Sequence, residues 1–553
     1  MRYRYAWSNA PVCAPARTTI ISGLYPPSTG SEHMRSMTSL APEMKMYPTL
    51  LREAGYYTSN NAKEDYNLEH TGKVWDESSQ RAHWRKRAPG QPFLSVFNFL
   101  ITHESQVRTR PHKWIHDPGK APVPPYHPDT LEVRQDWAQY YDNITTMDGM
   151  AAKVLKELHD DGLTDSTIVF FYGDHGAGMP RSKRWPYNSG LHVPLIVHVP
   201  EKFRHLAPKE YRPGGTSDRM AAFVDLAPTV ASIAGIKPPA YMQGSALMGA
   251  YPGTERQYNY GFRGRMDERY DLVRSVRDRR YVYIRNYMPH RIYGQFIEYM
   301  FETPTTRVWK ELYDAGKLLP PRTHFWETKP PEELYDLESD PYETRNLAAA
   351  PGHKSTLERL RSAQREWTTS IRDVGFLPES EIHSRSRGST PYQMGHDEKR
   401  YPMRRVFETA ELAAGLEKAV EPELLKRLGD SDSAVRYWAA MGLLMRGHPA
   451  PEKLLADPSP NVRIVAAESL GRYGSAADTT KALATLLELA PVDRNGAYVS
   501  LLALGALDAL GAKAKPVAAQ IKSLVVEDEK APQRAQKYGG NLQRKLLRDL
   551  GQG

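Results

Sequence analysis

The most constraining stretch of this sequence surrounds its single cysteine, Cys13, which lies in a Cys-x-Pro-x-Arg pattern that ends at Arg17. The proline at position 15 suits the first turn of a helix, because that position needs no amide hydrogen. Residues 16–24 can continue the helix, which would place Cys13 at its positive end, where free amide groups favour an anion. The pattern therefore places Cys13 where an anion is favoured, although a lone cysteine is more commonly a packing residue.

This stretch resembles a known family signature. Cys13, Pro15 and Arg17, followed by Ser22-Gly23-Leu24-Tyr25-Pro26, resemble the signature of the type I, formylglycine-dependent sulfatases of the alkaline phosphatase superfamily. The resemblance implies that a formylglycine-generating enzyme oxidises Cys13 to formylglycine, whose hydrated aldehyde attacks sulfur, and that Arg17 holds this hydrate. It further implies a bound Ca²⁺ ion and a sulfated carbohydrate substrate.

Three further residues lie where the family has sulfate-binding side chains. Lys63 follows a predicted strand over residues 56–59. His103 follows the apolar run 93–99, and Lys183 precedes a Gly-x-x-x-Pro strand entry. The resemblance implies that Lys63 and Lys183 hold the sulfate oxygens and that His103 protonates the leaving atom. Without it, each would be interpreted as a surface lysine or a loop histidine.

One position departs from the family pattern. Two residues after Lys63 many members have a histidine that holds the hydrate, whereas this chain has Asp65. The hydrate contact is therefore open, and the departure favours a subfamily distant from the arylsulfatases. The overall pattern most resembles bacterial enzymes described as heparan N-sulfatase-like. Hydrolysis of O-sulfate esters, and of phosphonate or phosphate monoesters, are the alternatives on the same scaffold.

A predicted strand over residues 167–172 ends in Gly173-Asp174-His175-Gly176, which resembles the metal-binding turn of the family. The resemblance implies that Asp174 and His175, with the oxidised Cys13, ligate calcium, and a carboxylate oxygen suits such a hard cation. The family has two further aspartates at the end of a strand that precedes the cysteine. No acidic residue occurs before Cys13 here, and residues 1–10 match only the usual approach to it. We therefore expect that first strand and those ligands to be missing, through a misplaced start or a broken gene.

Five more residues are predicted substrate contacts. His33 and Arg35 follow the nucleophile helix in a loop. Arg265, Asp267 and Glu268 precede two short strands that alternate in polarity, as an antiparallel hairpin does. These side chains would reach the sugar beyond the sulfate group. The alternative is that all five are ordinary surface residues.

The first 250 residues alternate between apolar strands and amphipathic helices. Strands are predicted at 93–99, 167–172 and 192–199, and helices at 142–159 and 219–234. This alternation favours an α/β fold with a mostly parallel sheet flanked by helices, as in alkaline phosphatase-like proteins, with its ligand site at the carboxyl ends of the strands. The apolar stripe of 142–159 is expected to pack in the core. Residues 251–400 are predicted to form a small antiparallel subdomain and a linker.

The C-terminal segment, residues 401–553, repeats itself. The repeated residues are Asp430, Val435, Arg436, Ala439, Ala440 and Leu443, which recur as Asp457, Val462, Arg463, Ala466, Ala467 and Leu470. Stacked helix pairs with small residues at their contacts give such a pattern, so the segment resembles an all-α HEAT-like solenoid. Such repeats bind a protein partner, or they are a packed structural appendage.

The charge balance favours polyanionic partners, because 74 lysines and arginines exceed 65 aspartates and glutamates by 9. No nucleic-acid recognition motif is present, so nucleic acid is not an expected partner. One cysteine excludes an internal disulfide framework. No apolar run is long enough to span a bilayer, and no apolar core of a signal peptide follows Met1. The resemblance nevertheless implies export to the periplasm or beyond.

A competing function class follows from the expected loss of metal ligands. A chain without them would be a non-catalytic, truncated remnant that binds polyanions, or that binds a protein through its repeats. The enzyme hypothesis instead predicts hydrolysis of sulfate esters or sulfamates on a sulfated glycan.

Overall fold

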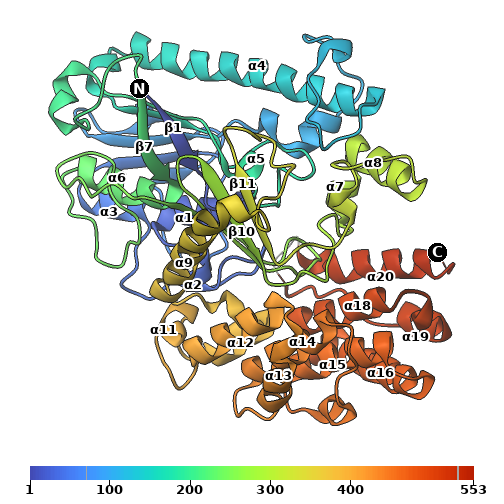
Figure 1. Cartoon of the computed structure of the whole chain (residues 1–553). Helices are drawn as coiled ribbons and strands as arrows, with labels where there is room; N and C mark the ends of the chain where they lie inside the picture. Colours follow the sequence, from blue (N-terminus) through green and yellow to red (C-terminus); the bar gives the residue numbers. More distant parts are fainter. Residues whose placement is uncertain (70, 532–534, 553) are drawn as a thin grey trace.

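The first strand of the chain lies inside a sheet. The computed structural model describes residues 1–69, 71–531 and 535–552. Strand β1 (Arg2–Trp7) is an interior strand of a four-stranded sheet with the order β5-β6-β1-β7 (Figure 1). The other strands are β5 (Val169–Tyr172), β6 (Leu195–His198) and β7 (Thr216–Ala222). The stretch before Cys13 is therefore a central strand, and not merely an approach to the cysteine.

Three strands of this sheet share one direction. β1 runs parallel to β7, whereas β6 runs antiparallel to both β1 and β5, so β5, β1 and β7 point the same way. A second, three-stranded sheet is wholly parallel and consists of β3 (Glu77–Ser78), β2 (Tyr57–Asn61) and β4 (Phe93–Phe97). The predicted α/β class with mostly parallel strands is confirmed. β4 and β5 are edge strands among the described residues, so their apolar side chains are half-buried.

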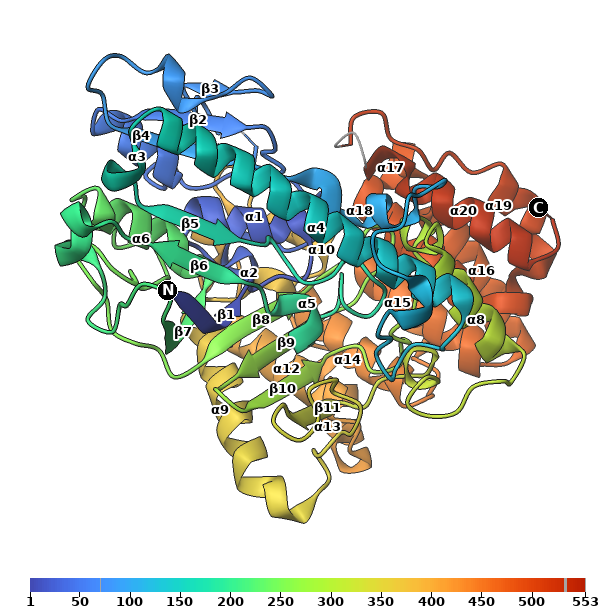
Figure 2. The same ribbon diagram turned by 90° about the horizontal axis from the view of Figure 1, so that it is seen from above.

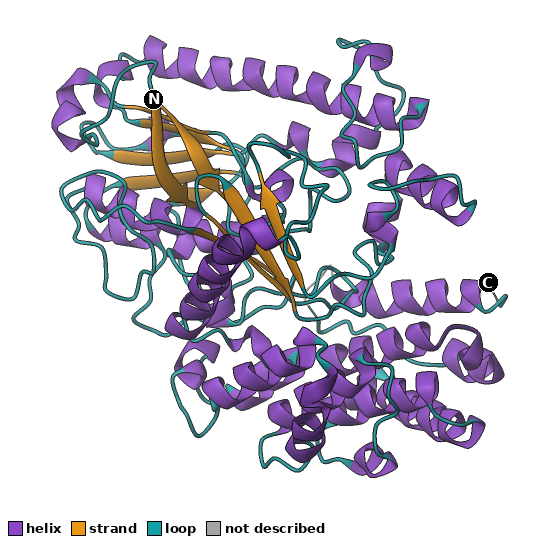
Figure 3. Cartoon of the chain, in the orientation of Figure 1, coloured by secondary structure: helices purple, strands orange, loops and turns teal. Residues whose placement is uncertain are grey.

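Helices cover both faces of the strands (Figure 1; Figure 3). On one face lie α1 (Cys13–Ser22), α2 (Pro26–Thr29), α3 (Tyr47–Glu53) and α6 (Leu226–Ile233), and on the other lies the long α4 (Leu131–Asp160). The predicted helix at 219–234 begins late, because its first residues belong to β7. α4 packs through its N-terminal half, where Val133 and Trp137 are buried. The core role predicted for its later stripe is wrong, since Ile144 and Leu155 are exposed.

An antiparallel subdomain follows, as predicted. Its order is β11-β10-β9-β8, and its strands are β8 (Asn259–Arg263), β9 (Val273–Arg277), β10 (Tyr281–Asn286) and β11 (Glu332–Asp336). The helices associated with it are α5 (Asn188–Leu191), α7 (Glu298–Phe301), α8 (Pro304–Asp314) and α9 (Lys354–Ser370). Helix α9 packs on β9 and β10.

The C-terminal third forms a helical layer beside the strands, seen in orange and red (Figure 1; Figure 2). Its helices are α10 (Glu379–Arg385), α11 (Pro391–Gly395), α12 (Met403–Gly415), α13 (Glu421–Arg427), α14 (Ser433–Met445), α15 (Pro460–Tyr473), α16 (Ala476–Leu489), α17 (Val492–Asn495), α18 (Ala497–Leu510), α19 (Ala518–Lys522) and α20 (Tyr538–Asp549). The repeated alanines of α14 and α15 are buried between packed helices, which confirms the stacked repeats.

One segment of these repeats, residues 497–522, is long and apolar enough to cross a membrane by length and composition. It is 56% buried within the protein, because Leu501, Leu504 and Leu507 pack in the core of the repeats. The segment is therefore accounted for by the interior of the repeats.

Candidate active site

Cys13 is the first residue of helix α1, directly after the carboxyl end of β1. Its side chain is buried at 2% exposure, and the first turn contains no acidic residue. Burial, reinforced by the nearby Asp65, raises the pKa of the Cys13 thiol. The thiol is therefore protonated at neutral pH and is a poor nucleophile as it stands. Chemistry at this position requires a different group in place of the thiol.

Arg17, one turn further along α1, joins three loops that follow strands. Its Nε atom lies 3.1 Å from Asp174 Oδ2, after β5. Its other nitrogens donate to Asn98 Oδ1 at 2.8 Å, after β4, and to the Lys63 carbonyl at 3.1 Å, after β2. Arg17 therefore holds the ends of three strands against the helix that carries Cys13.

Asp65 stands two residues after Lys63, where many members of the family have a histidine. Its carboxylate accepts a hydrogen bond from the Cys13 thiol and forms ion pairs with Arg35 and, at 3.5 Å, with Lys63. Burial alone would raise the pKa of Asp65, but these two cations hold it below its usual value. The carboxylate is thus ionised and lies directly beside position 13.

His103 and Lys183 meet on the other side of the site. Lys183 Nζ lies 3.4 Å from His103 Nε2 and 2.6 Å from Glu104 Oε2. The backbone N–H of Ser105 donates to His103 Nδ1, so we assign the proton of the neutral ring to Nε2. Burial and the charge of Lys183 lower the pKa of His103 to about 3, which keeps the ring neutral at pH 7.

The two facing donors form a candidate anion site. An N–H group and an ammonium group that point at the same space repel one another unless an acceptor lies between them. The backbone N–H of Arg184, the residue after Lys183, donates to the Pro11 carbonyl at 2.7 Å, so the segment that carries Lys183 lies next to the residues that precede Cys13. A group with several anionic oxygens is the acceptor that fits.

Asp174 and His175 do not by themselves complete a cation site. Asp174 is already paired with Arg17, and His175 Nδ1 lies 2.8 Å from the Gly176 carbonyl. Among the described residues no group of three or more histidine, cysteine, aspartate or glutamate side chains could hold a metal ion. Calcium takes six to eight oxygen ligands, so the donors present here do not fit a complete calcium centre.

Three predicted substrate contacts lie elsewhere. Arg265 is fully buried and its guanidinium group pairs with Glu379, so it cannot reach a sugar. His33 is buried and accepts a hydrogen bond from the Arg265 backbone, and Glu268 is buried and accepts one from the Glu298 backbone. These three predictions failed because polarity in a loop does not distinguish a buried ion pair from a free side chain.

The other two predicted contacts do lie near the centre. Arg35 reaches Asp65, and Asp267 lies 3.0 Å from Arg184 Nε. Arg184 in turn binds both oxygens of Glu104, at 3.0 and 3.1 Å. Sequence reasoning missed Glu104 and Arg184 as supports of the site, although each directly follows a predicted catalytic residue in the chain.

We expect Glu104→Gln to destabilise the protein in a pH-dependent way. Burial would raise the pKa of Glu104, but Arg184 and Lys183 lower it to about 2 from 4.5. A lowered pKa contributes stability above pH 4.5 that is lost as the pH falls through about 2. The loss in the free energy of unfolding should be about 3 kcal/mol at pH 7 and less than half of that at pH 3. Urea unfolding at both pH values measures it.

The control for this variant is Glu302→Gln, which removes a carboxylate paired with Arg108 on the surface. Such a pair contributes at most about 1 kcal/mol. An equal loss at pH 7 and pH 3 for Glu104→Gln would contradict the ionised state assigned to Glu104.

Comparison with known proteins finds relatives of both parts of the chain. The sulfatase family model matches residues 59–236, and the HEAT repeat model matches residues 421–508. An ulvan-active sulfatase of Formosa agariphila is 39% identical over 430 residues, which cover 69% of this chain and 71% of that protein. Human N-sulphoglucosamine sulphohydrolase is 28% identical over 277 residues, covering 47% and 52%. The solved structure of a 2-O GAG sulfatase aligns with a TM-score of 0.48 at 18% identity, covering 68% of this chain and 85% of that one.

The α/β sheet, the cysteine at a helix N-terminus and the converging basic residues are compatible with a hydrolase that acts on anionic groups. Within that class, the level of identity and coverage assigns the family. The chain belongs to the sulfatase family and carries HEAT repeats at its C-terminus.

Proposed function

We propose that this protein hydrolyses sulfate esters of a sulfated polysaccharide. The observation that carries the proposal is the pair of facing donors, His103 Nε2 and Lys183 Nζ, which lie 3.4 Å apart near position 13. Sulfate is a tetrahedral oxyanion, and its oxygens can accept from both donors at once. Membership of the sulfatase family gives the reaction class.

The relatives suggest the first substrates to try. Ulvan, a sulfated polysaccharide, is named for the relative with 39% identity, whereas an N-sulfated glucosamine is named for the human relative with 28% identity. O-sulfate ester hydrolysis is therefore the first candidate activity, and sulfamate hydrolysis of the heparan type is the second.

We infer that Cys13 is converted to formylglycine, which supplies a hydrated aldehyde as the nucleophile. Arg17 orients the end of α1 and lowers the cost of negative charge there. Lys63 and Lys183 hold the anionic oxygens of the substrate. His103 acts as the general acid once its ring has taken up a second proton beside the bound anion, and it returns to the neutral ring when it gives its Nε2 proton to the leaving oxygen. Bound sulfate would raise the pKa of His103 from its low value, because an anion favours the protonated ring.

Asp65→Asn should lower kcat by about 10²-fold, because Asp65 is the ionised group that touches position 13 and can accept a proton there. Asparagine keeps the shape and one acceptor oxygen but loses the charge. Peptide mass spectrometry of position 13 in the variant separates a failure of conversion from a failure of catalysis. An unchanged kcat with normal conversion would remove Asp65 from the mechanism.

A calcium ion would need oxygen donors in addition to Asp174 and His175, because no group of three or more ligating side chains is present among the described residues. Isothermal titration of the protein with calcium tests this directly. The incomplete donor set also favours a second candidate function, a non-catalytic chain that binds a polyanion. Binding of sulfated polysaccharide without sulfate release would support that alternative.

The test of the proposed function is sulfate release, measured by ion chromatography after incubation with ulvan, with N-sulfated and with O-sulfated glycosaminoglycan. Peptide mass spectrometry should find position 13 lighter than cysteine by about the mass of one water, after encounter with a formylglycine-generating enzyme. Export to the periplasm or the medium belongs to the same proposal, and cell fractionation tests it. If none of the three substrates released sulfate and Cys13 kept its thiol, the enzyme hypothesis would be overturned.

A further inference from the structure

The C-terminal repeats reach the catalytic centre through one side chain. Tyr538, the first residue of α20, is buried, and its hydroxyl donates to Asp267 Oδ1 at 3.1 Å. Asp267 lies in the loop between β8 and β9, far from Tyr538 in sequence. The last helix of the repeats therefore contacts a loop that belongs to the sulfatase subdomain.

From Asp267 a chain of buried ion pairs leads to Lys183. Asp267 Oδ2 accepts from Arg184 Nε at 3.0 Å, and Arg184 binds both oxygens of Glu104. Glu104 Oε2 lies 2.6 Å from Lys183 Nζ. The side chains of Glu104, Lys183 and Arg184 are each no more than 5% exposed. Buried charges of this kind keep their geometry only while each partner is in place.

The chain of pairs is balanced in charge, with two cations and two anions. Glu104 raises the pKa of Lys183 against the effect of burial, so the lysine is charged. Tyr538 supplies a neutral donor to the terminal carboxylate, and Arg184 occupies its other oxygen. Loss of the hydroxyl leaves one oxygen of a buried carboxylate without that donor, which allows Asp267 and then Arg184 to rotate.

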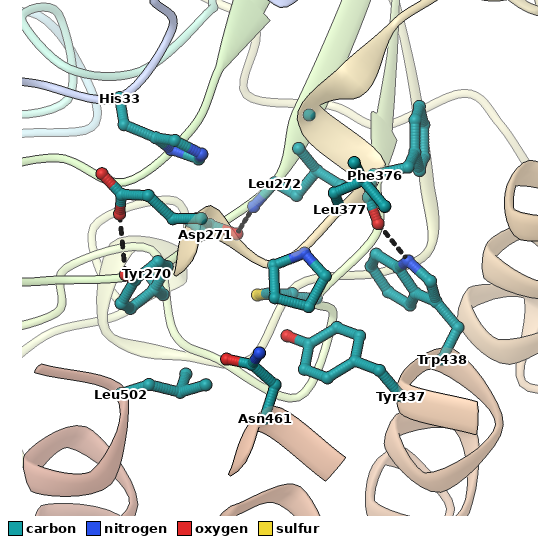
Figure 4. Close-up of a pocket in the computed structure, with 14 residues that line it drawn as sticks. His33, Tyr270, Asp271, Leu272, Phe376, Leu377, Tyr437, Trp438, Asn461 and Leu502 are labelled. Atoms are coloured by element: carbon teal, nitrogen blue, oxygen red, sulfur yellow. Dashed lines mark hydrogen bonds between the residues drawn. The ribbon is translucent and has the colours of Figure 1, made fainter. Parts of the chain in front are cut away.

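A second contact between the repeats and the core bypasses the Asp267 carboxylate. Figure 4 shows Tyr437, Trp438 and Asn461 of the repeats facing Tyr270 across a cavity of about 20 Å³, room for about one water. The Tyr270 hydroxyl donates to Glu379 Oε2 at 2.7 Å, and Glu379 is paired with Arg265. Arg265 also donates to the backbone carbonyl of Asp267, so these groups contact the backbone of that loop, but they make no hydrogen bond to the Asp267 carboxylate that Arg184 binds.

We propose that Tyr538 is a positioning residue for Lys183, so that the HEAT repeats are an integral part of the active site and not only a docking module. The inference rests on the proposed role of Lys183 in binding sulfate. The repeats then take part in binding the substrate. Asp267, which was predicted to contact the sugar, instead belongs to the series of ion pairs that leads to Lys183.

The test compares Tyr538→Phe with Tyr270→Phe, the same chemical change at the same interface. Kinetics of sulfate release and titration with inorganic sulfate are measured on the full chain of each. Tyr538→Phe should lower kcat/KM and weaken sulfate binding by about five- to tenfold, the effect of one hydrogen bond to a charged group. Tyr270→Phe should leave both within about twofold, although both variants lose stability.

Two further variants keep the test decisive. Asp267→Asn should show a loss at least as large as that of Tyr538→Phe, and the double variant should equal Asp267→Asn alone, because Tyr538 acts through Asp267. Additive losses would overturn the proposed route. If Tyr538→Phe fails to fold, Asp267→Asn tests the proposal by itself. Unchanged sulfate binding by Asp267→Asn would overturn the proposal.

The outcomes separate this inference from the proposed function. Turnover by the wild type with equal behaviour of the two tyrosine variants would overturn the inference and leave the sulfatase activity standing. Sulfate binding without turnover in the wild type, weakened only by Tyr538→Phe, would support the inference and count against the activity. Absence of sulfate binding in the wild type would overturn both.

Discussion

Replacement of Cys13 by alanine is expected to abolish sulfate release, with kcat falling by at least about 10³-fold. The variant keeps helix α1, because alanine is a strong helix former. The N-terminus of α1 has no side-chain cap hydrogen bond that the substitution would remove. Removal of one buried sulfur should cost about 1 kcal/mol of stability. Ion chromatography of released sulfate, with thermal unfolding to verify the fold, measures both effects.

The control is Ser22→Ala, at the other end of the same helix, where the hydroxyl donates to the Thr18 carbonyl at 2.6 Å. That variant should lose some stability and keep its activity. Retained turnover in Cys13→Ala would remove position 13 from the chemistry. Turnover by a wild-type protein whose Cys13 is an unmodified thiol would instead contradict the formylglycine assignment.

The positions of Cys13, Lys63, His103 and Asp174 could be predicted because each matches a family motif. For His103 and Asp174 a second signal agrees, because each follows a strand whose apolar run is visible in the sequence, whereas the strands before Cys13 and Lys63 are not apolar runs. Strands β1 and β5 point the same way, and Arg17 links the loops after β2, β4 and β5. The rule that ligands gather at the carboxyl ends of strands predicts that these side chains lie at one edge of the sheets.

The supports of the centre could not be predicted in the same way. Glu104, Arg184 and Asp267 are close only in space, and a sequence alone does not state which buried charge pairs with which. Local periodicity also failed where the tertiary context decides burial, as along α4, whose apolar residues Ile144 and Leu155 are exposed. Long-range pairing and burial are properties of the packed chain, and the contact of Tyr538 with Asp267 is the extreme case.

Lys183→Met is expected to lower kcat/KM by about 10²- to 10³-fold, because it removes a charge aimed at the sulfate oxygens in a buried site. Methionine preserves most of the aliphatic stem. Glu104 keeps its two hydrogen bonds from Arg184, so the chain of ion pairs from Asp267 survives in part. The affinity for inorganic sulfate should fall with the rate, and titration calorimetry of the variant measures that affinity directly.

The matched control is Lys329→Met, which removes another buried lysine whose Nζ lies 2.8 Å from both oxygens of Asp271. Breaking either buried pair costs stability, by up to about 3–5 kcal/mol when the remaining charge has no other partner. Only Lys183→Met should affect sulfate binding. If the two variants lost activity in proportion to stability alone, Lys183 would be a structural cation. If sulfate affinity fell only for Lys183→Met, the facing donors of Lys183 and His103 would be the anion site that distinguishes a working sulfatase from a packed remnant.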